Sequence, residues 1–308
     1  MKRLSIFLAL FLALSGSALA QQQPNVQQKL NVVTTTADLA SITQEIGGDR
    51  VDVSSIAKGY QDPHFVEPKP SFLLLLRKAD LLEVVGLDLE VGWLPPLLDQ
   101  SRNVKIRPGG PGYLDVSTGV EILDRPTGNV NRSMGDVHAM GNPHYWIDPA
   151  NAVRIAIQVS KKLSALRPND AAYFADRLET FKKRMNEANK KWTAMLAPYR
   201  GAKIVTYHNS WPNFVRRYGL NVVGFVEPKP GVPPSPSHTF ELINLMKEQK
   251  VKAILVEPYF DLKTPQSIAE RTGAGLLVMY PSVGARPELD DYFKLFDRNI
   301  NELVKVLR

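Results

Sequence analysis

The sequence predicts an α/β fold of two (βα)4-like lobes with parallel sheets, joined by one long rigid α-helix. Apolar, β-branched runs alternate with helical patterns in both halves of the chain. Strands that alternate with helices typically form a parallel sheet covered on both faces. A long helical pattern without proline or glycine separates the strand-helix series of the first half from that of the second half. At 308 residues, the chain can build two lobes, each with its own core.

The first series begins with an apolar run at residues 30–35, followed by a helical pattern that stops at Gly47-Gly48. This is the order of a strand, a helix and a glycine stop. The same reading gives a strand at 51–56, a helix at 70–78 and a strand at 81–85. After residue 200, it gives strands at 203–206, 222–226, 253–256 and 276–279, with helices between them. The repetition predicts two similar lobes.

Residues 169–197 form the predicted connector between the lobes. Apolar residues recur in it every three or four positions, which is the spacing of one helix face. They are Phe174, Leu178, Phe181, Met185, Ala188, Trp192 and Met195. We expect this helix to be a rigid spine packed along both lobes. Two segments look like loops: 107–112, rich in proline and glycine, and 127–142, a polar flap beside His144.

The N-terminus has the pattern of a cleavable export signal. A positive head is followed by an apolar run at 4–14, and Ala18-Leu19-Ala20 offers small residues for cleavage after Ala20. The apolar run is too short to span a bilayer. The predicted divisions are a signal peptide at 1–20, an N-terminal metal-binding lobe at 21–167, the linking helix at 168–198 and a C-terminal metal-binding lobe at 199–308.

Composition narrows the possible functions. The chain contains no cysteine, so it has no disulfide, no thiolate metal ligand and no residue that could carry a bacterial lipid anchor. We therefore expect a soluble periplasmic protein that is not a lipoprotein. The formal charge of +7 comes from Lys and Arg dispersed among acidic residues, which argues against nucleic-acid binding and favours a solvated surface on a monomer.

Three of the five histidines lie where a metal site could form, in loops at the edge of the predicted sheets. His64 follows the strand at 51–56, His144 lies between Pro143 and Tyr145, and His208 directly follows the strand at 203–206. Ligands of doubly wound sheets bind beyond the carboxyl ends of the strands. Histidines delivered there from both lobes would converge in the cleft between them. Imidazole is the commonest protein ligand for zinc, so this arrangement predicts a metal site.

The chain resembles, over essentially all of its mature length, the solute-binding proteins of ABC-type zinc and manganese importers, the cluster A-I or helical-backbone group. The resemblance rests on several motifs and their order. They are Asp62-Pro63-His64 with Glu67-Pro68, Pro143-His144-Tyr145-Trp146-Ile147-Asp148-Pro149, Tyr207-His208, Pro234-Ser235-Pro236 and Glu257-Pro258-Tyr259-Phe260. The resemblance implies two βα lobes with one metal between them, His64, His144 and His208 as ligands, and an ABC importer permease as partner.

This chain differs from the family pattern at the position of the fourth ligand. Members of the family commonly carry an aspartate after the last strand, but this chain reads Tyr280-Pro281-Ser282-Val283-Gly284. Proline has no ligating side chain, so the fourth position falls to water or to another carboxylate. In a 2-1-3-4 sheet order, the strand that ends before Glu257 lies beside the strand that ends before His208. We therefore predict Glu257 as the fourth ligand, with a supporting role behind His208 as its alternative.

The remaining histidines, His138 and His238, are weaker candidates. His138 lies in the flap, where zinc-specific relatives often carry a histidine-rich loop, and His238 lies at a helix start after Ser235-Pro236-Ser237. Three imidazoles and at most one carboxylate suit tetrahedral zinc better than manganese, which prefers more oxygen donors. The alternatives are a manganese- or iron-binding member of the same group, a secreted zinc metallohydrolase with Glu257 as general base, and a surface adhesin, which the missing anchor cysteine disfavours.

Overall fold

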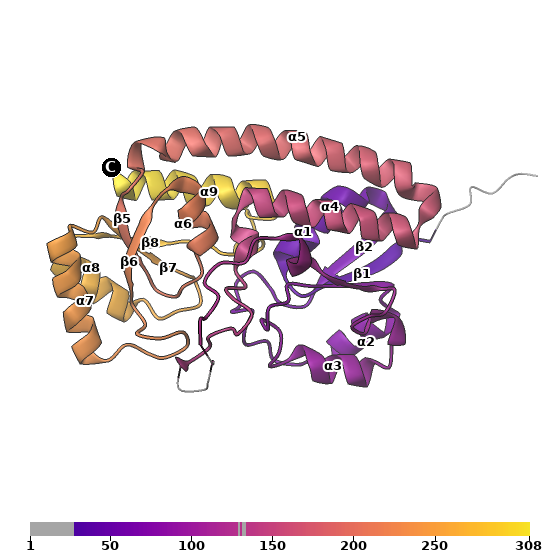
Figure 1. Ribbon diagram of the computed structural model, residues 1–308, viewed down its shortest axis with the longest axis horizontal. Helices are drawn as coiled ribbons and strands as arrows, with labels where there is room; N and C mark the ends of the chain where they lie inside the picture. The colour runs from indigo at the N-terminus through magenta and orange to yellow at the C-terminus, as the bar shows by residue number, and fades with distance from the viewer. Residues whose placement is uncertain (1–27, 129, 131–133) are drawn as a thin grey trace, which may run out of the picture.

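The structure is a computed structural model that describes residues 28–128, 130 and 134–308. The predicted signal peptide, residues 1–20, lies outside the described residues. Figure 1 shows two lobes side by side, with α5 lying across the top of both. Each lobe contains a four-stranded parallel sheet, ordered β2-β1-β3-β4 in one lobe and β6-β5-β7-β8 in the other. The predicted α/β architecture and the 2-1-3-4 order are confirmed.

The N-terminal lobe is built on β1, β2 and β3 with their helices, and a short fourth strand completes its sheet. Its elements are β1 (Leu30–Thr34), α1 (Ala37–Gly47), β2 (Val51–Ser55), α2 (Pro70–Lys78), β3 (Leu81–Val84), α3 (Leu94–Ser101), β4 (Tyr113–Asp115) and α4 (Pro149–Leu166). The glycine stop of α1 is confirmed, because the backbone turns at Gly48 with a φ of 54°. The pattern analysis missed β4, because three residues are too few to show a strand's alternation.

The C-terminal lobe repeats the arrangement. Its elements are β5 (Lys203–Thr206), α6 (Pro212–Tyr218), β6 (Asn221–Phe225), α7 (Pro236–Gln249), β7 (Ala253–Val256), α8 (Lys263–Thr272), β8 (Gly275–Val278) and α9 (Tyr292–Leu307). The helix start expected at Ser235 is confirmed, since its hydroxyl accepts a hydrogen bond from the amide of His238 and Pro236 takes the first turn. Strands β5 and β7 are neighbours, so the segments after them reach the same edge.

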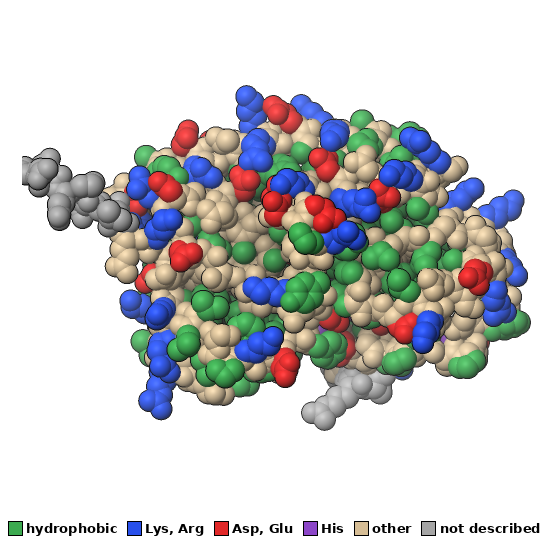
Figure 2. All heavy atoms as spheres, turned by 180° about the vertical axis from the view of Figure 1, so that it is seen from behind, with side chains coloured by type: hydrophobic (Ala, Val, Ile, Leu, Met, Phe, Trp, Pro, Cys, Tyr) green, Lys and Arg blue, Asp and Glu red, His purple; other side chains and the backbone are tan. Residues whose placement is uncertain are grey.

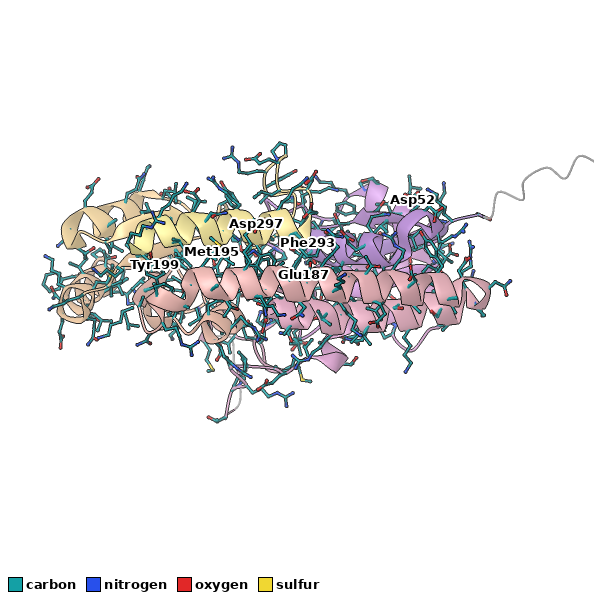
Figure 3. All side chains as sticks on the ribbon, turned by 90° about the horizontal axis from the view of Figure 1, so that it is seen from above. Asp52, Glu187, Met195, Tyr199, Phe293 and Asp297 are labelled. Carbon is teal, nitrogen blue, oxygen red and sulfur yellow. The ribbon has the colours of Figure 1, made fainter. Side chains whose placement is uncertain are left out.

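The connecting helix α5 (Ala171–Leu196) has 26 residues. Its buried residues are Phe174, Phe181, Met185, Trp192 and Leu196, which are all apolar. Seen from above, α5 lies beside α9, whose Phe293 and Asp297 are labelled in Figure 3. The indole of Trp192 stacks on Phe296 at 5.0 Å between ring centroids and donates a 2.7 Å hydrogen bond to Asp297. Helix α5 also packs against α1 and α4 of the N-terminal lobe, and its buried residues share one apolar core with both lobes.

The loop after β8 crosses to the N-terminal lobe. The carbonyl of Pro281 accepts a 3.0 Å hydrogen bond from the indole of Trp146, and the amide of Val283 donates to Asp38 at 3.1 Å. Gly59 packs against the same loop so closely that a Cβ there would lie 2.0 Å from the carbonyl oxygen of Val283. The loop after β8, which contains Pro281 and Val283, therefore fastens the two lobes together.

The surface agrees with the dispersed charge of the sequence. On the face seen in Figure 2, Lys and Arg side chains lie among Asp and Glu without a single-sign patch. No helix in the described ranges is long and apolar enough to cross a membrane.

Candidate metal centre

Three histidines converge between the lobes. His64 follows β2 in the N-terminal lobe, His144 stands at the end of the flap just before α4, and His208 comes two residues after β5 in the C-terminal lobe. One ring nitrogen from each lies within 4.8 Å of the others. The three ring centroids are 5.1, 5.4 and 5.5 Å apart. The structure brings together the three histidines that the sequence singled out.

The spacing fits a metal ion. Zinc binds imidazole nitrogens at about 2.0–2.1 Å, so two ligands of a tetrahedral ion lie roughly 3.3 Å apart. Since the nitrogens lie within 4.8 Å of one another, they need to approach by at most about 1.5 Å to surround the ion. Neither ring nitrogen of His144 has a hydrogen-bond partner among the described residues, although this side chain is 1% exposed. A buried polar atom without a partner is costly, and a metal ion would provide one.

The surroundings of His144 favour its neutral form, which is the form that can bind a metal ion. Burial lowers its pKa well below the ordinary histidine value, and the neighbouring His64 and His208 lower it further. Its amide donates to the side chain of Asn142 at 2.9 Å, and Asn142 also donates to the carbonyl of Asn209 in the other lobe at 2.8 Å. The position of His144 is therefore tied to the backbone beside His208.

His208 has a carboxylate behind it. Its Nδ1 pairs with Oε1 of Glu227, and the other oxygen of Glu227 accepts from the amide of Gly231 at 3.1 Å. Burial opposes the charged form of His208, but the hydrogen bond and the charge of Glu227 outweigh it and raise its pKa. This pairing leaves Nε2 of His208 for a metal. A carboxylate behind a metal-binding histidine fixes the tautomer and raises the basicity of the ligand.

His64 has the same arrangement. Its Nδ1 lies 2.7 Å from Oδ1 of Asp62, which leaves Nε2 facing the cleft. Burial acts to raise the pKa of Asp62, but the hydrogen bond and charge of His64 lower it overall. Neither Asp62 nor Glu227 was predicted from the sequence to support a histidine. Glu227 follows β6, the strand beside β5, so the same argument from strand ends could have found it.

Glu257 does not belong to the compact group of three. It is fully buried, and its Oε1 accepts a 2.9 Å hydrogen bond from the indole of Trp211. Its other oxygen lacks a well-formed hydrogen bond within the described ranges. Burial raises the pKa of Glu257 to about 7, although the nearby His208 acts to lower it. The carboxylate of Glu257 is therefore buried close enough to His208 for the two charges to interact.

The two other histidines lie in different surroundings. Nε2 of His138 lies 3.2 Å from Nε2 of His64. His238 has other partners. Its ring bonds to the carbonyl of Phe225 at 3.0 Å, and its amide donates to the hydroxyl of Ser235 in the cap of α7. His138 therefore lies next to the site, although its sequence context made it no stronger a candidate than His238.

Comparison with known proteins agrees with this fold. The family model described as "Zinc-uptake complex component A periplasmic" matches residues 32–306. The chain belongs to this family. The sequence-based resemblance to solute-binding proteins of zinc and manganese importers is thereby confirmed.

Relatives of this zinc-uptake family member differ in the metal they are named for. The manganese ABC transporter substrate-binding lipoprotein PsaA of Streptococcus pneumoniae is 26% identical over 100% of this chain and 99% of its own length. A metal ABC transporter substrate-binding lipoprotein of Lactococcus lactis is 25% identical over 98% and 96%. The crystal structure of ZnuA superposes with a TM-score of 0.76 at 24% identity, covering 91% of this chain and 100% of that one. At that identity, the structural likeness concerns the fold alone.

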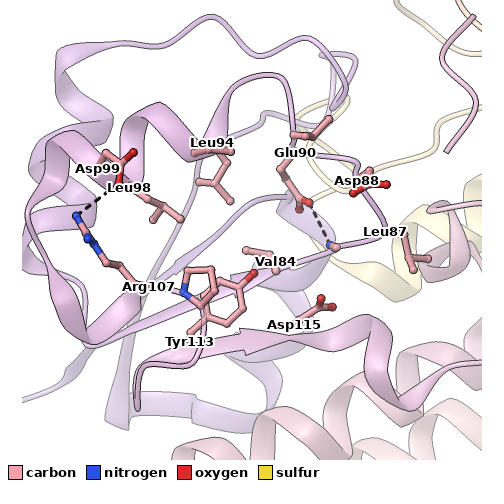
Figure 4. A pocket seen from close by; sticks show the side chains of 14 residues that line it. Val84, Leu87, Asp88, Glu90, Leu94, Leu98, Asp99, Arg107, Tyr113 and Asp115 are labelled. Carbon is pink, nitrogen blue, oxygen red and sulfur yellow. Dashed lines mark hydrogen bonds and ion pairs between the residues drawn. The ribbon is translucent and has the colours of Figure 1, made fainter. Parts of the chain in front are cut away.

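A larger cavity of the zinc-uptake family member lies away from the histidines. It measures about 570 Å³ and lies beside α3 and β4, as Figure 4 shows. Two of its acidic groups have partners: Asp99 lies 3.5 Å from Arg107, and Glu90 accepts hydrogen bonds from the amides of Val85 and Gly86. Burial, together with Asp115 and Glu90, raises the pKa of Tyr113 in its wall to about 12. None of the three clustered histidines lines it.

The pairing of Glu227 with His208 leads to a first prediction. We expect Glu227→Gln to weaken metal binding about 10- to 100-fold at pH 8, the usual cost of losing such a supporting carboxylate. Glu227 raises the pKa of His208. As the pH falls, protons therefore begin to compete with the metal for His208 at a higher pH in the wild type than in the variant. The difference between the two proteins should therefore shrink as the pH falls. Chelator competition at several pH values measures it.

Glu241→Gln is the matched control, because Glu241 is an exposed residue of α7. It should bind metal like the wild type at every pH. A deficit in Glu227→Gln that stays constant from pH 8 to pH 5.5 would contradict the account of His208.

Proposed function

We propose that the protein captures one divalent transition metal ion, zinc, between its lobes in the periplasm and delivers it to an ABC importer. His64, His144 and His208 are the proposed ligands, and Glu257 is the proposed fourth. The observation that supports this most strongly is the convergence of three ring nitrogens from two lobes within 4.8 Å. Two of the three imidazoles also have a carboxylate on the nitrogen that faces away from the cleft.

The donor set favours zinc. Three imidazoles with one carboxylate match tetrahedral zinc sites, whereas manganese prefers more oxygen donors. The family description names zinc, but several relatives are named for manganese. The loop after the last strand reads Tyr280-Pro281-Ser282-Val283-Gly284 and offers no carboxylate there, which supports zinc over manganese. The carrier role follows family membership, and the permease partner, the monomeric state and the free periplasmic location are proposed with it.

A metallohydrolase is the competing function. Three histidines and a water molecule also hold catalytic zinc. We propose a carrier, because membership of the zinc-uptake family and the fastening of both lobes around the cluster suit capture and transfer. The zinc-loaded protein should therefore show no turnover of ester or phosphoester substrates.

Metal analysis of protein purified from the periplasm without added metal tests the proposal. We expect one zinc ion per chain, and calorimetric titration of the metal-free protein should give the same stoichiometry. Because the ligands must be deprotonated, the affinity should fall as the pH drops through the imidazole range. Tighter binding of manganese than of zinc would refute the choice of metal. A protein that binds neither ion would refute the function.

A further inference from the structure

A small polar cavity lies between α4 of the N-terminal lobe and α6 of the C-terminal lobe. Its volume is about 150 Å³, and every side chain that lines it is charged or an amide. The lining residues are Glu121, Asp148, Asn151, Arg154, Asn213, Arg216 and Arg217. None of the three clustered histidines is among them. The cavity is therefore a separate feature of the interface between the lobes.

Two ion pairs cross between the lobes in the wall of this cavity. Arg216 donates to both carboxylate oxygens of Glu121, at 2.7 and 2.5 Å. Arg217 donates to both carboxylate oxygens of Asp148, at 2.8 and 3.0 Å. A guanidinium group has more N–H donors than such a pair uses, whereas each carboxylate oxygen already accepts one of these bonds. The wall therefore keeps more donors than acceptors.

The lining also has an excess of positive charge. Arg154 donates to the neutral side chain of Asn151 at 2.7 Å, so three guanidinium groups and two carboxylates surround the space. A hydrogen bond from Arg216, together with the charges of Arg216 and Arg154, lowers the pKa of Glu121. Even with both carboxylates charged, the lining has a net charge of +1, and this charge favours an anion.

Asn213 adds a buried donor to the wall. The residue is 5% exposed, and its Oδ1 accepts a hydrogen bond from the side chain of Asn151 at 3.3 Å. Its Nδ2 has no hydrogen-bond partner among the described residues. A buried donor without an acceptor costs free energy. An acceptor bound in the cavity would remove that cost.

We propose that this cavity binds a small tetrahedral oxyanion, phosphate or sulfate, and that the bound anion holds the two lobes together. Its oxygens accept hydrogen bonds from the arginines of α4 and α6 and from Nδ2 of Asn213. The planar fork of a guanidinium group matches the geometry of such oxyanions. A volume of about 150 Å³ suits the free ion better than a larger organic phosphate.

The bound anion should strengthen zinc binding, and this part of the inference rests on the proposed function. Helix α4 begins five residues after His144, and α6 begins four residues after His208. An anion held by both helices favours the arrangement in which these two imidazoles lie 5.4 Å apart between ring centroids. Zinc bound to both favours the same arrangement. Two ligands coupled in this way raise each other's affinity by the same factor, which we expect to be about fivefold.

Calorimetric titration of the metal-free mature protein with phosphate and with sulfate tests the site, with chloride at equal ionic strength as the blank. We expect one anion per chain from either salt. Arg154→Gln should weaken anion binding about tenfold, the scale of one lost charged hydrogen bond. Asn213→Asp keeps an oxygen for Asn151 but replaces the buried donor with a carboxylate oxygen, so it should weaken anion binding further.

Lys161→Gln is the matched control, because it removes one positive charge from an exposed position of α4 outside the lining. It should bind phosphate and sulfate like the wild type. The melting temperature of each variant in chloride reports whether it folds. If the wild type bound neither anion, or if folded Asn213→Asp bound them as tightly as the wild type, the proposed site would be wrong.

Chelator competition in sulfate and in chloride of equal ionic strength measures the coupling to zinc. Sulfate should raise the zinc affinity of the wild type and of Lys161→Gln about fivefold, and it should leave that of Asn213→Asp unchanged. Equal zinc affinity of the wild type in both salts, with sulfate bound, would refute the coupling. A protein that bound the anions but no zinc would refute the proposed function, and the coupling with it, while the anion site would stand.

Discussion

His208→Ala should weaken zinc binding by orders of magnitude. Among the three clustered histidines, His208 alone comes from the C-terminal lobe, so its removal leaves a half-site on one lobe. The loss should exceed the roughly 100-fold upper end that is typical of outer-shell changes. It should also show in stability, because a ligand that binds the folded state stabilises it by RT ln(1 + [L]/Kd). Each tenfold rise in Kd at saturating zinc then removes about 1.4 kcal/mol of that stabilisation.

His238→Ala is the control for His208→Ala. His238 belongs to the same lobe, but its ring bonds to the carbonyl of Phe225 and not to the cluster. Calorimetry and chelator competition should show wild-type affinity for this variant, and zinc should raise its melting temperature as in the wild type. An unchanged affinity in His208→Ala would rule out a site shared between the lobes.

Glu257→Gln should also cause a large loss of zinc affinity. If Glu257 is the fourth ligand, its oxygen lies about 2.0–2.2 Å from zinc, and the substitution should cost more than the roughly 100-fold upper limit of an outer-shell change. The fold should stay intact, because the amide keeps an oxygen for the indole of Trp211, which now bonds to Oε1. Burial raises the pKa of Glu257 to about 7, so at pH 6 zinc must displace a proton from it. The variant should release fewer protons on binding.

Calorimetry in buffers with different ionisation enthalpies counts those protons. The control is Glu241→Gln, the exposed carboxylate of α7, which should release the same number as the wild type. A zinc-bound crystal structure decides the role directly. A carboxylate well beyond the roughly 2.2 Å length of a Zn–O bond, with water in the fourth position, would make Glu257 a supporting residue and leave the three histidines in place.

Much of the fold was accessible from local patterns. Alternating strand and helix signals, the stop at Gly48 and the start at Ser235 depend on neighbouring residues, and the structure confirms them. The three histidines were also accessible, because the carboxyl ends of parallel strands meet at one edge. The strand β4 was not, since three residues carry too little periodicity. Whether Glu257 binds the metal stays a prediction.

The sequence by itself determined two α/β lobes, a stiff connector and three histidines at the strand ends. Only the tertiary structure decided what surrounds them. Glu227 supports His208 from 19 residues away, the Pro281 loop is fastened to Trp146 across the lobes, and His138 is brought against His64 from 74 residues away. Local patterns determine helices and strands because they involve neighbours only two to four positions apart. Contacts between distant loops depend on how the lobes pack. That packing places Glu227, the Pro281 loop and His138 around the same cleft.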